Sequence, residues 1–308
     1  MWLILTVLVF TFLIFLVLPE KYKPLITGFF FTIFGIFTSW IAVYTLFTGN
    51  IIEYITDQTS FIVDQLSAVF ILLINFTVIS QFFYSTGYLK GYTINKSSFK
   101  TSLHYANIIF AYISMLLVVS VHSSTGFLIF WEILSLSTFL LVLFDGENEK
   151  IRRSAINYLF QMHLGMFLLL AGFVITSNIS SSGFEAIRIY FSIHKAWPVF
   201  LLFFIGFGLK AGFLGMHTWL PDAHPSAPSH VSALMSGIII KMGIYGILRV
   251  TSLLPDKSLV IGIIVLLFSS ATGLYGVMQA IIQHDIKRLL AFHSIENIGI
   301  IGMGIGVG

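Results

Sequence analysis

Long apolar runs, separated by short polar segments, account for most of the chain. None of them alternates apolar and polar residues between turns, as the roughly ten-residue strands of a transmembrane β-barrel would. A helix needs about 20 mostly apolar residues to cross a bilayer. We therefore expect an all-α polytopic membrane protein with about ten transmembrane helices. The segments that qualify are approximately 2–18, 25–48, 66–86, 105–121, 124–144, 155–177, 197–216, 231–254, 259–282 and 289–306.

Composition supports lipid as the solvent. Of the 308 residues, 57% are hydrophobic and 9% are charged, whereas a soluble domain carries about 25% charged residues. The net charge of +3 does not indicate nucleic acid as a partner, because Lys and Arg sit singly or in pairs between apolar runs and form no basic stripe. The chain contains no cysteine, so it has no thiolate metal site, iron–sulfur ligand or thiolate redox centre.

The distribution of Lys and Arg predicts the orientation. The first apolar run has no basic region before it and no small-residue cleavage site, so we expect a retained span and not a signal peptide. Alternate loops carry ten of the 16 Lys and Arg, the opposite loops and span ends carry four, and two lie within spans. This bias places the first set in the cytoplasm and the N-terminus outside. The ten are Lys21, Lys23, Lys90, Lys96, Lys100, Lys150, Arg152, Arg153, Lys287 and Arg288, and the four are Arg188, Lys195, Arg249 and Lys257.

Three charged residues, Glu132, Lys210 and Lys241, have apolar sequence on both sides within expected spans. A charge at the centre of a transmembrane helix costs about 2.5–3.5 kcal/mol on insertion scales. We therefore expect all three to face the bundle interior, with pairing as the natural compensation. One interpretation is a structural ion pair that locks two helices, and the other is a proton or cation relay of coupled titrating groups. The usual role of intramembrane ionisable groups favours the relay.

Further ionisable residues join the relay as weaker candidates. His163 lies in the middle of an apolar span, where a lone histidine is more often a packing residue. Glu296 and His293 lie inside the last span, and Glu296 is deep enough to need a partner. Asp64 marks the edge of a span, where an interfacial charge is the simpler interpretation.

The segment HTWLPDAHPSAPSH joins the two lysine-bearing spans, and its three prolines forbid a continuous helix. Its ionisable residues match no metal-binding spacing. We interpret the segment as a rigid connector whose histidines can hand protons inward. Glycines on both sides of each lysine would allow close helix approach or local unwinding. The connector residues are His217, Asp222, His224 and His230.

Three stretches resemble the antiporter-like, proton-translocating membrane subunits of respiratory complex I, Mrp-type cation/proton antiporters and group 4 membrane-bound hydrogenases. The resemblance covers most of the chain and is strongest from residue 120 onward. AHPSAPSHVSALMSG, HSIENIG and His163 are most similar to the large membrane subunit of formate hydrogenlyase-type hydrogenases. The three stretches are FWEILSLSTFLLV, GLKAGFLGMHTWLPDAHPSAPSHVSALMSGIIIKMGIYGILR and DIKRLLAFHSIENIG.

The resemblance implies a role for each central residue. The glutamate of the family's fifth span falls on Glu132, the lysine of its broken seventh span on Lys210, and the relay residue of its eighth span on Lys241. In the family these residues form a half-channel and a polar axis at mid-membrane. Related subunits often carry a histidine where this chain has Asn297, beside Glu296, so the relay beyond Lys241 stays open.

The resemblance also implies a domain organisation. Family members have about fourteen spans built around two inverted five-helix repeats. Residues 1–104 would then form N-terminal helices 1–3, residues 105–254 the first repeat, and residues 255–308 the start of a truncated second repeat. We expect a fragment, a truncated gene product, or a split subunit whose missing helices come from a second chain.

The expected function is translocation of protons or sodium ions in a redox-driven hydrogenase-like or complex I-like assembly. Its partners would be other membrane subunits and a peripheral redox arm, in a prokaryotic inner membrane. A non-conducting membrane scaffold, and a subunit of an Mrp-type antiporter or inorganic-carbon uptake complex, stay open as alternatives. The chain carries no nucleotide-hydrolysis or soluble-enzyme motif. We therefore expect no cofactor, and any oxidoreductase activity would belong to the complex.

Overall fold

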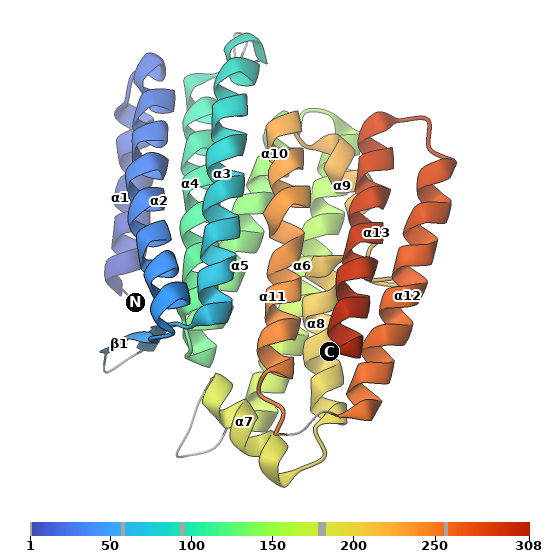
Figure 1. Ribbon diagram of the computed structural model, residues 1–308. Helices are drawn as coiled ribbons and strands as arrows, with labels where there is room; N and C mark the ends of the chain where they lie inside the picture. Colours follow the sequence, from blue (N-terminus) through green and yellow to red (C-terminus); the bar gives the residue numbers. More distant parts are fainter. Residues whose placement is uncertain (1, 57–58, 93–95, 178–182, 256–257) are drawn as a thin grey trace.

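The computed structural model describes residues 2–56, 59–92, 96–177, 183–255 and 258–308, and its helices stand side by side in one bundle (Figure 1). Short 3₁₀ turns at Glu20–Tyr22 and Leu143–Asp145 complete the regular structure of these ranges. The elements are α1 (Trp2–Val17), α2 (Lys23–Thr48), β1 (Ile52–Thr56), β2 (Thr59–Val63), α3 (Gln65–Tyr92), α4 (Ser98–Ser120), α5 (Ser124–Val142), α6 (Glu149–Thr176), α7 (Phe184–Ile193), α8 (Trp197–Ala211), α9 (Leu220–Ser226), α10 (Ser229–Leu234), a π-helix (Met235–Ile239), α11 (Ile240–Thr251), α12 (Leu259–Ile281) and α13 (Ile286–Val307).

The helices have the length and surface of membrane spans. Among the described residues, eight helical segments are long and apolar enough to cross a bilayer. Helix α1 has 16 residues and the apolar α8 has 15, so both are shorter. Large apolar side chains face outward, with Phe47 88% and Phe76 74% exposed, and such a surface requires lipid. The expected class, an α-helical polytopic membrane protein, is confirmed.

The two ends of the bundle differ in charge. We call the end where α2, α4, α6 and α13 begin the basic end, and the opposite end, which carries β1 and β2, the hairpin end (Figure 1). The ten Lys and Arg that we expected on one side of the membrane lie in the connections and adjoining helix turns of the basic end. The loops that we expected on one side of the membrane therefore lie together at one end of the bundle.

The hairpin departs from the all-helical expectation. Strand β1 pairs antiparallel with β2, with Ile52 opposite Val63. Isoleucine, threonine, tyrosine and phenylalanine dominate both strands, and these residues favour extended backbone. A β-bridge from Phe61 to Val121 ties the hairpin to the connection between α4 and α5.

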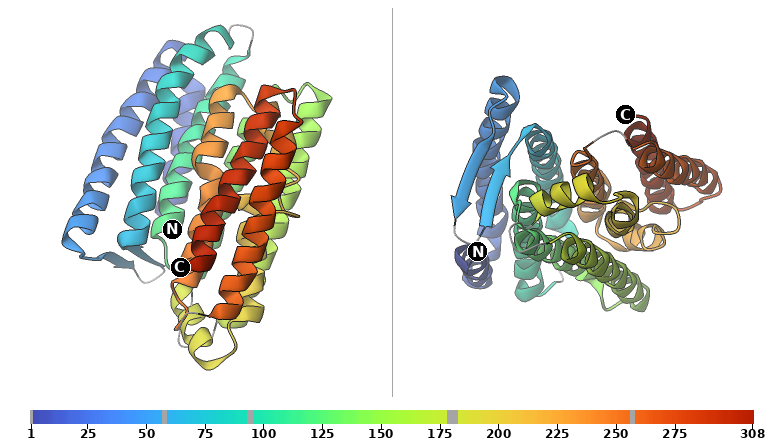
Figure 2. Two further views of the ribbon diagram at one scale, coloured as in Figure 1. Left: turned by 45° about the vertical axis from the view of Figure 1, so that its right-hand side comes forward. Right: turned by 90° about the horizontal axis from the view of Figure 1, so that it is seen from below.

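The structure around α8 differs from the simple pattern of spans and loops in two places. Residues 197–216 were expected as one span, but α8 stops at Ala211 and the chain continues irregularly to α9. The connection between α6 and α8 contains α7, and Figure 2 shows this helix lying across the ends of the upright helices. Phe184 and Ile187 of α7 are buried, because its apolar face packs on the bundle. Residues 178–182 lie outside the described residues.

Candidate ion-relay site

Glu132 lies near the middle of α5 and contacts α6, where its Oε1 is 3.0 Å from Nε2 of His163. Nδ1 of His163 is 2.9 Å from the carbonyl oxygen of Leu159. A carbonyl only accepts, so Nδ1 carries the hydrogen, and in a neutral ring Nε2 presents a lone pair to the carboxylate. The contact becomes attractive when His163 or Glu132 binds a further proton. The packing of α5 on α6 thus places a carboxylate and an imidazole nitrogen within hydrogen-bonding distance.

Lys210 lies in the last turn of α8 and is 1% exposed. Its ammonium donates to Oγ of Ser135 at 2.9 Å and lies 4.5 Å from the ring centroid of Trp131. These two residues flank Glu132 on α5, so Lys210 interacts electrostatically with its carboxylate. No ion pair joins Lys210 to a carboxylate within 4.0 Å among the described residues. The expected direct pairing is replaced by a hydroxyl, an aromatic face and the favourable carbonyl end of α8.

The sequence after Lys210 ends α8 within the bundle. Gly212 has a φ of 86°, a left-handed conformation that favours glycine, and its amide donates to the Gly208 carbonyl at 2.7 Å. The indole of Trp219 donates to the Leu209 carbonyl at 2.7 Å and satisfies one of the carbonyls freed by the helix end. The break therefore leaves Lys210 at a helix terminus and not inside a continuous span.

Lys241 follows a second irregularity. The π-helix of Met235–Ile239 makes a bond from the Ile240 amide to the Met235 carbonyl, five residues back. The Lys241 ammonium donates to the carbonyl of Ser236, also five residues back. A π-turn shifts carbonyls away from their usual partners and is common at functional sites. The local backbone, and not a carboxylate, thus binds this lysine.

Glycines hold α8 and α11 close together. A Cβ added at Gly243 would lie 2.5 Å from the Phe207 carbonyl oxygen, and one at Gly246 would lie 2.3 Å from the Phe207 ring. Both approaches are too short for any side chain, so these two positions require glycine. The packing of α8 on α11 brings together the helices that carry Lys210 and Lys241.

The connector residues take separate positions. His217 is buried beside Tyr275, with ring centroids 4.8 Å apart, and Nδ1 of His224 is 2.7 Å from Oγ of Ser232. Asp222 is exposed. Within the described part of the chain, no three His, Asp or Glu residues form a group that could hold a metal ion. The connector therefore presents individual histidines and not a metal centre.

A pocket of about 380 Å³ lies beside the connector, between α10 and α13. Its lining includes Lys287, whose ammonium donates to the Ala227 carbonyl at 2.9 Å, and Ser236, whose carbonyl binds Lys241. The pocket therefore reaches from the basic end to the residue that binds Lys241. The lining residues include His224, Ser229, Ser232, Ser236, Lys287, His293, Ser294 and Asn297.

Glu296 and His293 pair with each other on α13. Nδ1 of His293 lies 2.7 Å from Oε2 of Glu296. This supplies the partner that the depth of Glu296 required. The pair lies on a different helix from Glu132, Lys210 and Lys241, and His293 lines the same pocket as Ser236, whose carbonyl binds Lys241.

His230 has a partner that sequence reasoning missed. Its Nε2 lies 2.7 Å from Nε2 of His104 on α4, and both rings are buried. The expected span began at residue 105, whereas α4 starts at Ser98, where the Ser97 side chain caps its first turn. That capping serine was the available signal that His104 lies inside a helix.

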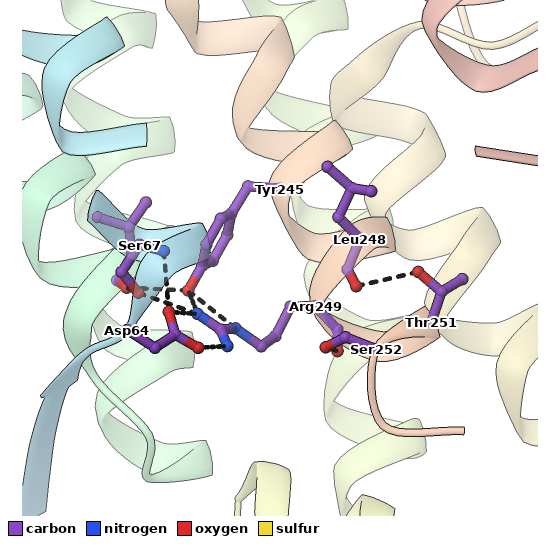
Figure 3. Close-up of polar contacts among 8 residues, drawn as sticks. Asp64, Ser67, Tyr245, Leu248, Arg249, Thr251 and Ser252 are labelled. Atoms are coloured by element: carbon purple, nitrogen blue, oxygen red, sulfur yellow. Dashed lines mark hydrogen bonds and ion pairs between the residues drawn. The ribbon is translucent and has the colours of Figure 1, made fainter. Parts of the chain in front are cut away.

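Asp64, which we expected as an interfacial charge at the edge of a span, has a partner that the sequence did not indicate. Its carboxylate forms an ion pair with Arg249 of α11, and Ser67 and Tyr245 complete the cluster at the hairpin end (Figure 3). Burial opposes ionisation of Asp64, but the Arg249 hydrogen bonds and charge, with the Ser67 amide, outweigh it and hold the pKa of Asp64 well below its usual range. Asp64 and Arg249 are 185 residues apart, so no local pattern pointed to the pair.

Comparison with known proteins places this arrangement in a family. The chain is 39% identical over 249 residues to Hydrogenase-4 component B of Escherichia coli, which covers 79% of this chain and 36% of that protein. The chain spans about a third of the length of that relative. The motif resemblance drawn from the sequence is thereby confirmed.

Solved structures show the same fold. A chain of the Mrp complex from Dietzia sp. superposes with a TM-score of 0.82 at 18% identity, covering 97% of this chain and 57% of that one. A chain of the membrane-bound sulfane sulfur reductase, an archaeal respiratory membrane complex, gives 0.79 at 17% identity, covering 98% and 64%. Residues 122–308 match the family described as NADH:quinone oxidoreductase/Mrp antiporter, TM. The chain belongs to this transmembrane family.

Proposed function

We propose that this chain translocates protons, or sodium ions, through a relay of Glu132, Lys210 and Lys241. The observation that carries the proposal is the setting of Lys210, a buried ammonium whose one hydrogen bond goes to a neutral hydroxyl. An ion pair would fix the charge, whereas this setting leaves Lys210 free to change its charge state, as a relay requires. The nearby carboxylate of Glu132 supplies the electrostatic coupling.

Neighbouring groups extend the relay at both ends. The Glu132–His163 contact provides a place for one proton. The cavity lined by His224, Ser232 and Ser236 provides polar access to Lys241 from the basic end. His217 and His230 would serve as connector groups, and Glu296 with His293 would carry ions onward through α13.

The wider assembly follows from the relatives. We propose ten spans, with residues 105–254 as a first five-helix repeat, residues 255–308 as the start of a second, and residues 1–104 as additional helices. The chain would lie in a prokaryotic inner membrane with its basic end in the cytoplasm and its N-terminus outside. Hydrogenase-4 component B is the relative that supports a hydrogenase-like complex. The redox reaction would then occur in a peripheral arm, and a second chain could supply further helices.

The test is Lys210→Ala in the complex assembled in inverted membrane vesicles. We expect redox turnover to continue while the number of ions moved per electron falls at least about tenfold. Lys150→Ala, which alters an exposed lysine at the basic end, is the matched control and should leave that ratio unchanged. Acidification would be followed with a pH-sensitive dye and sodium uptake with a sodium-sensitive dye.

The same assay separates the alternatives. An unchanged ratio in Lys210→Ala would contradict the relay. Normal transport after neutralising both Glu132 and Lys210 would instead support a scaffold role. Transport that needs no redox partner would favour an Mrp-type antiporter.

A further inference from the structure

The guanidinium of Arg249, near the hairpin end of α11, is bound by three side chains (Figure 3). Nη1 and Nη2 pair with the two carboxylate oxygens of Asp64, with Nη2 at 2.9 Å from Oδ1. Nη2 also donates to Ser67 Oγ at 2.9 Å, and Nε donates to Tyr245 Oη at 3.2 Å. Arg249 is 5% exposed. A guanidinium with this many charge-assisted bonds is fixed in place, and arginine does not lose its proton in proteins.

The groups around the guanidinium are also satisfied. The hydroxyls of Ser67 and Tyr245 both donate to the Val119 carbonyl of α4, the latter at 2.9 Å. Asp64 accepts from the Ser67 amide at 2.9 Å and so caps α3. The cluster therefore joins α3, α4 and α11, and the Asp64 carboxylate at its centre is already bound to Arg249 and to the Ser67 amide.

The position of the cluster relates it to the relay. Lys241, Tyr245 and Arg249 follow one another at intervals of four residues and share one face of α11. Arg249 lies about 12 Å beyond Lys241 along the helix axis, toward the hairpin end. The space between is packed, because Tyr245 is fully buried and its ring lies 5.1 Å from that of Phe70. An ion leaving Lys241 along this face would meet a packed interior and then the guanidinium of Arg249, which keeps its proton.

We infer that Arg249, held by Asp64 and Tyr245, is an electrostatic seal that prevents protons or metal cations at Lys241 from leaking to the hairpin end. Asp64 balances the charge of the pair, but the guanidinium itself offers only donors and no acceptor to an approaching cation, and arginine is used as a barrier to cations in selective pores. Asp64 and Tyr245 are positioning residues, since they hold the guanidinium on the face of α11 that carries Lys241, nearer the hairpin end. The inference rests on the proposed relay, because a seal has a function only if ions reach Lys241.

The test measures passive leak in proteoliposomes that contain the assembled complex without redox substrate. Valinomycin and a potassium gradient would impose a membrane potential, and internal pyranine would report proton uptake. Two variants are compared, Asp64→Asn alone and Asp64→Asn with Arg249→Gln, because they differ only in the guanidinium. We expect the first to leak no more than the unmodified protein. The second should leak at least about tenfold faster, the effect of one unit charge about 12 Å away at an effective dielectric constant near 20.

Further variants separate charge from packing. Arg249→Lys in the Asp64→Asn background keeps a charge without the planar fork, and its passive proton leak should not exceed that of Asp64→Asn alone. Arg188→Gln, which breaks an exposed pair with Glu185 on α7 at the same end, is the matched control. Its passive proton leak should equal that of the unmodified protein. Equal leak in the two principal variants, or equal leak with Lys and Gln at position 249, would overturn the seal.

This result is distinguishable from failure of the relay itself. Lys210→Ala should abolish driven transport while leaving passive leak at its original level. Driven transport that survives Lys210→Ala would contradict the proposed function, whereas the leak comparison at position 249 decides the seal alone.

Discussion

At mid-depth Lys210 donates to one hydroxyl and Lys241 to one backbone carbonyl, whereas at the hairpin end Arg249 donates to Asp64, Ser67 and Tyr245. Both regions remove cations from water, but they compensate them differently. Each mid-depth lysine donates to one neutral oxygen, with the Trp131 ring also beside Lys210, and Arg249 has a carboxylate in fork geometry with further neutral acceptors. A buried charge with one neutral partner can be lost or moved at little cost, whereas a charge in a satisfied network cannot.

The difference teaches how one bundle can hold charges for opposite purposes. Lysine is a point charge that loses its proton under desolvation, and arginine is a planar charge that keeps it. In each region the residue type and the number of its partners therefore point the same way: the lysines can change charge, and the arginine cannot. Stability measurements can test this agreement independently of transport.

The largest effect is expected for Arg249→Met, which leaves the partly buried Asp64 carboxylate without the buried guanidinium that binds it. Breaking a buried pair on one side costs about 3–5 kcal/mol of folding free energy. Lys210→Met should cost less than about 1 kcal/mol, because Ser135 keeps its own bond to the Trp131 carbonyl. Reversible unfolding in mixed micelles with increasing SDS would measure both.

The control for this prediction is Arg249→Met combined with Asp64→Asn, which removes the unpaired carboxylate and should recover much of the loss. A loss in Lys210→Met as large as in Arg249→Met would show that Lys210 is a structural clamp, and would end the distinction between the two regions.

A smaller effect is expected at Gly212, where the mid-depth region depends on a helix break. An added Cβ would meet only ordinary contacts, the nearest being Leu220 Cδ2 at 3.7 Å, so the cost of Gly212→Ala is conformational. A left-handed conformation costs a non-glycine residue about 1–2 kcal/mol. Gly87→Ala, in a helix with open space around it, should instead stabilise by up to about 1 kcal/mol. Equal changes in the free energy of unfolding for Gly212→Ala and Gly87→Ala would mean that the left-handed conformation of Gly212 does not limit which residue can end α8.

Sequence patterns predicted the features that depend on the spacing of apolar residues and on contact with lipid or water. The apolar runs located the helices, and the lysine and arginine bias identified the two ends of the bundle. The apolar run by itself gave no end for α8 at Ala211, whereas the family resemblance implied a broken span at Lys210, and the left-handed Gly212 lies where the helix ends. The hairpin was missed although residues 52–56 and 59–63 are rich in β-branched and aromatic residues, because the chain around them is helical.

Partners of buried groups were the least predictable features. The sequence suggested a lysine for Glu132, but the packing of α5 on α6 gives it His163. His104 meets His230 across 126 residues, and Asp64 meets Arg249 across 185. Each pair depends on which helix faces are brought together, and this depends on interhelical packing that no local pattern encodes.

The smallest effect is expected at the basic end, where Lys96 and Asp145 form the partly exposed counterpart of the Asp64–Arg249 pair. Lys96 Nζ lies 2.5 Å from Asp145 Oδ1, with side chains 21% and 20% exposed. The hydrogen bond that Lys96 donates to Asp145, together with the charge of that carboxylate, raises the pKa of Lys96 although burial opposes it. Lys96→Gln should lower the free energy of unfolding by about 0.2–1 kcal/mol near pH 7, as for other surface pairs.

The pH dependence of this loss follows from the sign of the pKa change. A raised folded-state pKa gives stability that is fully present below the unfolded value of about 10.4. That stability disappears as the pH rises through the folded value, so the difference between Lys96→Gln and the unmodified chain should fade at high pH. Arg153→Gln, which breaks the exposed pair with Glu149, is the control, because a guanidinium stays charged over this range. A Lys96→Gln difference that persists above the folded pKa would mean that packing, and not charge, holds the basic end.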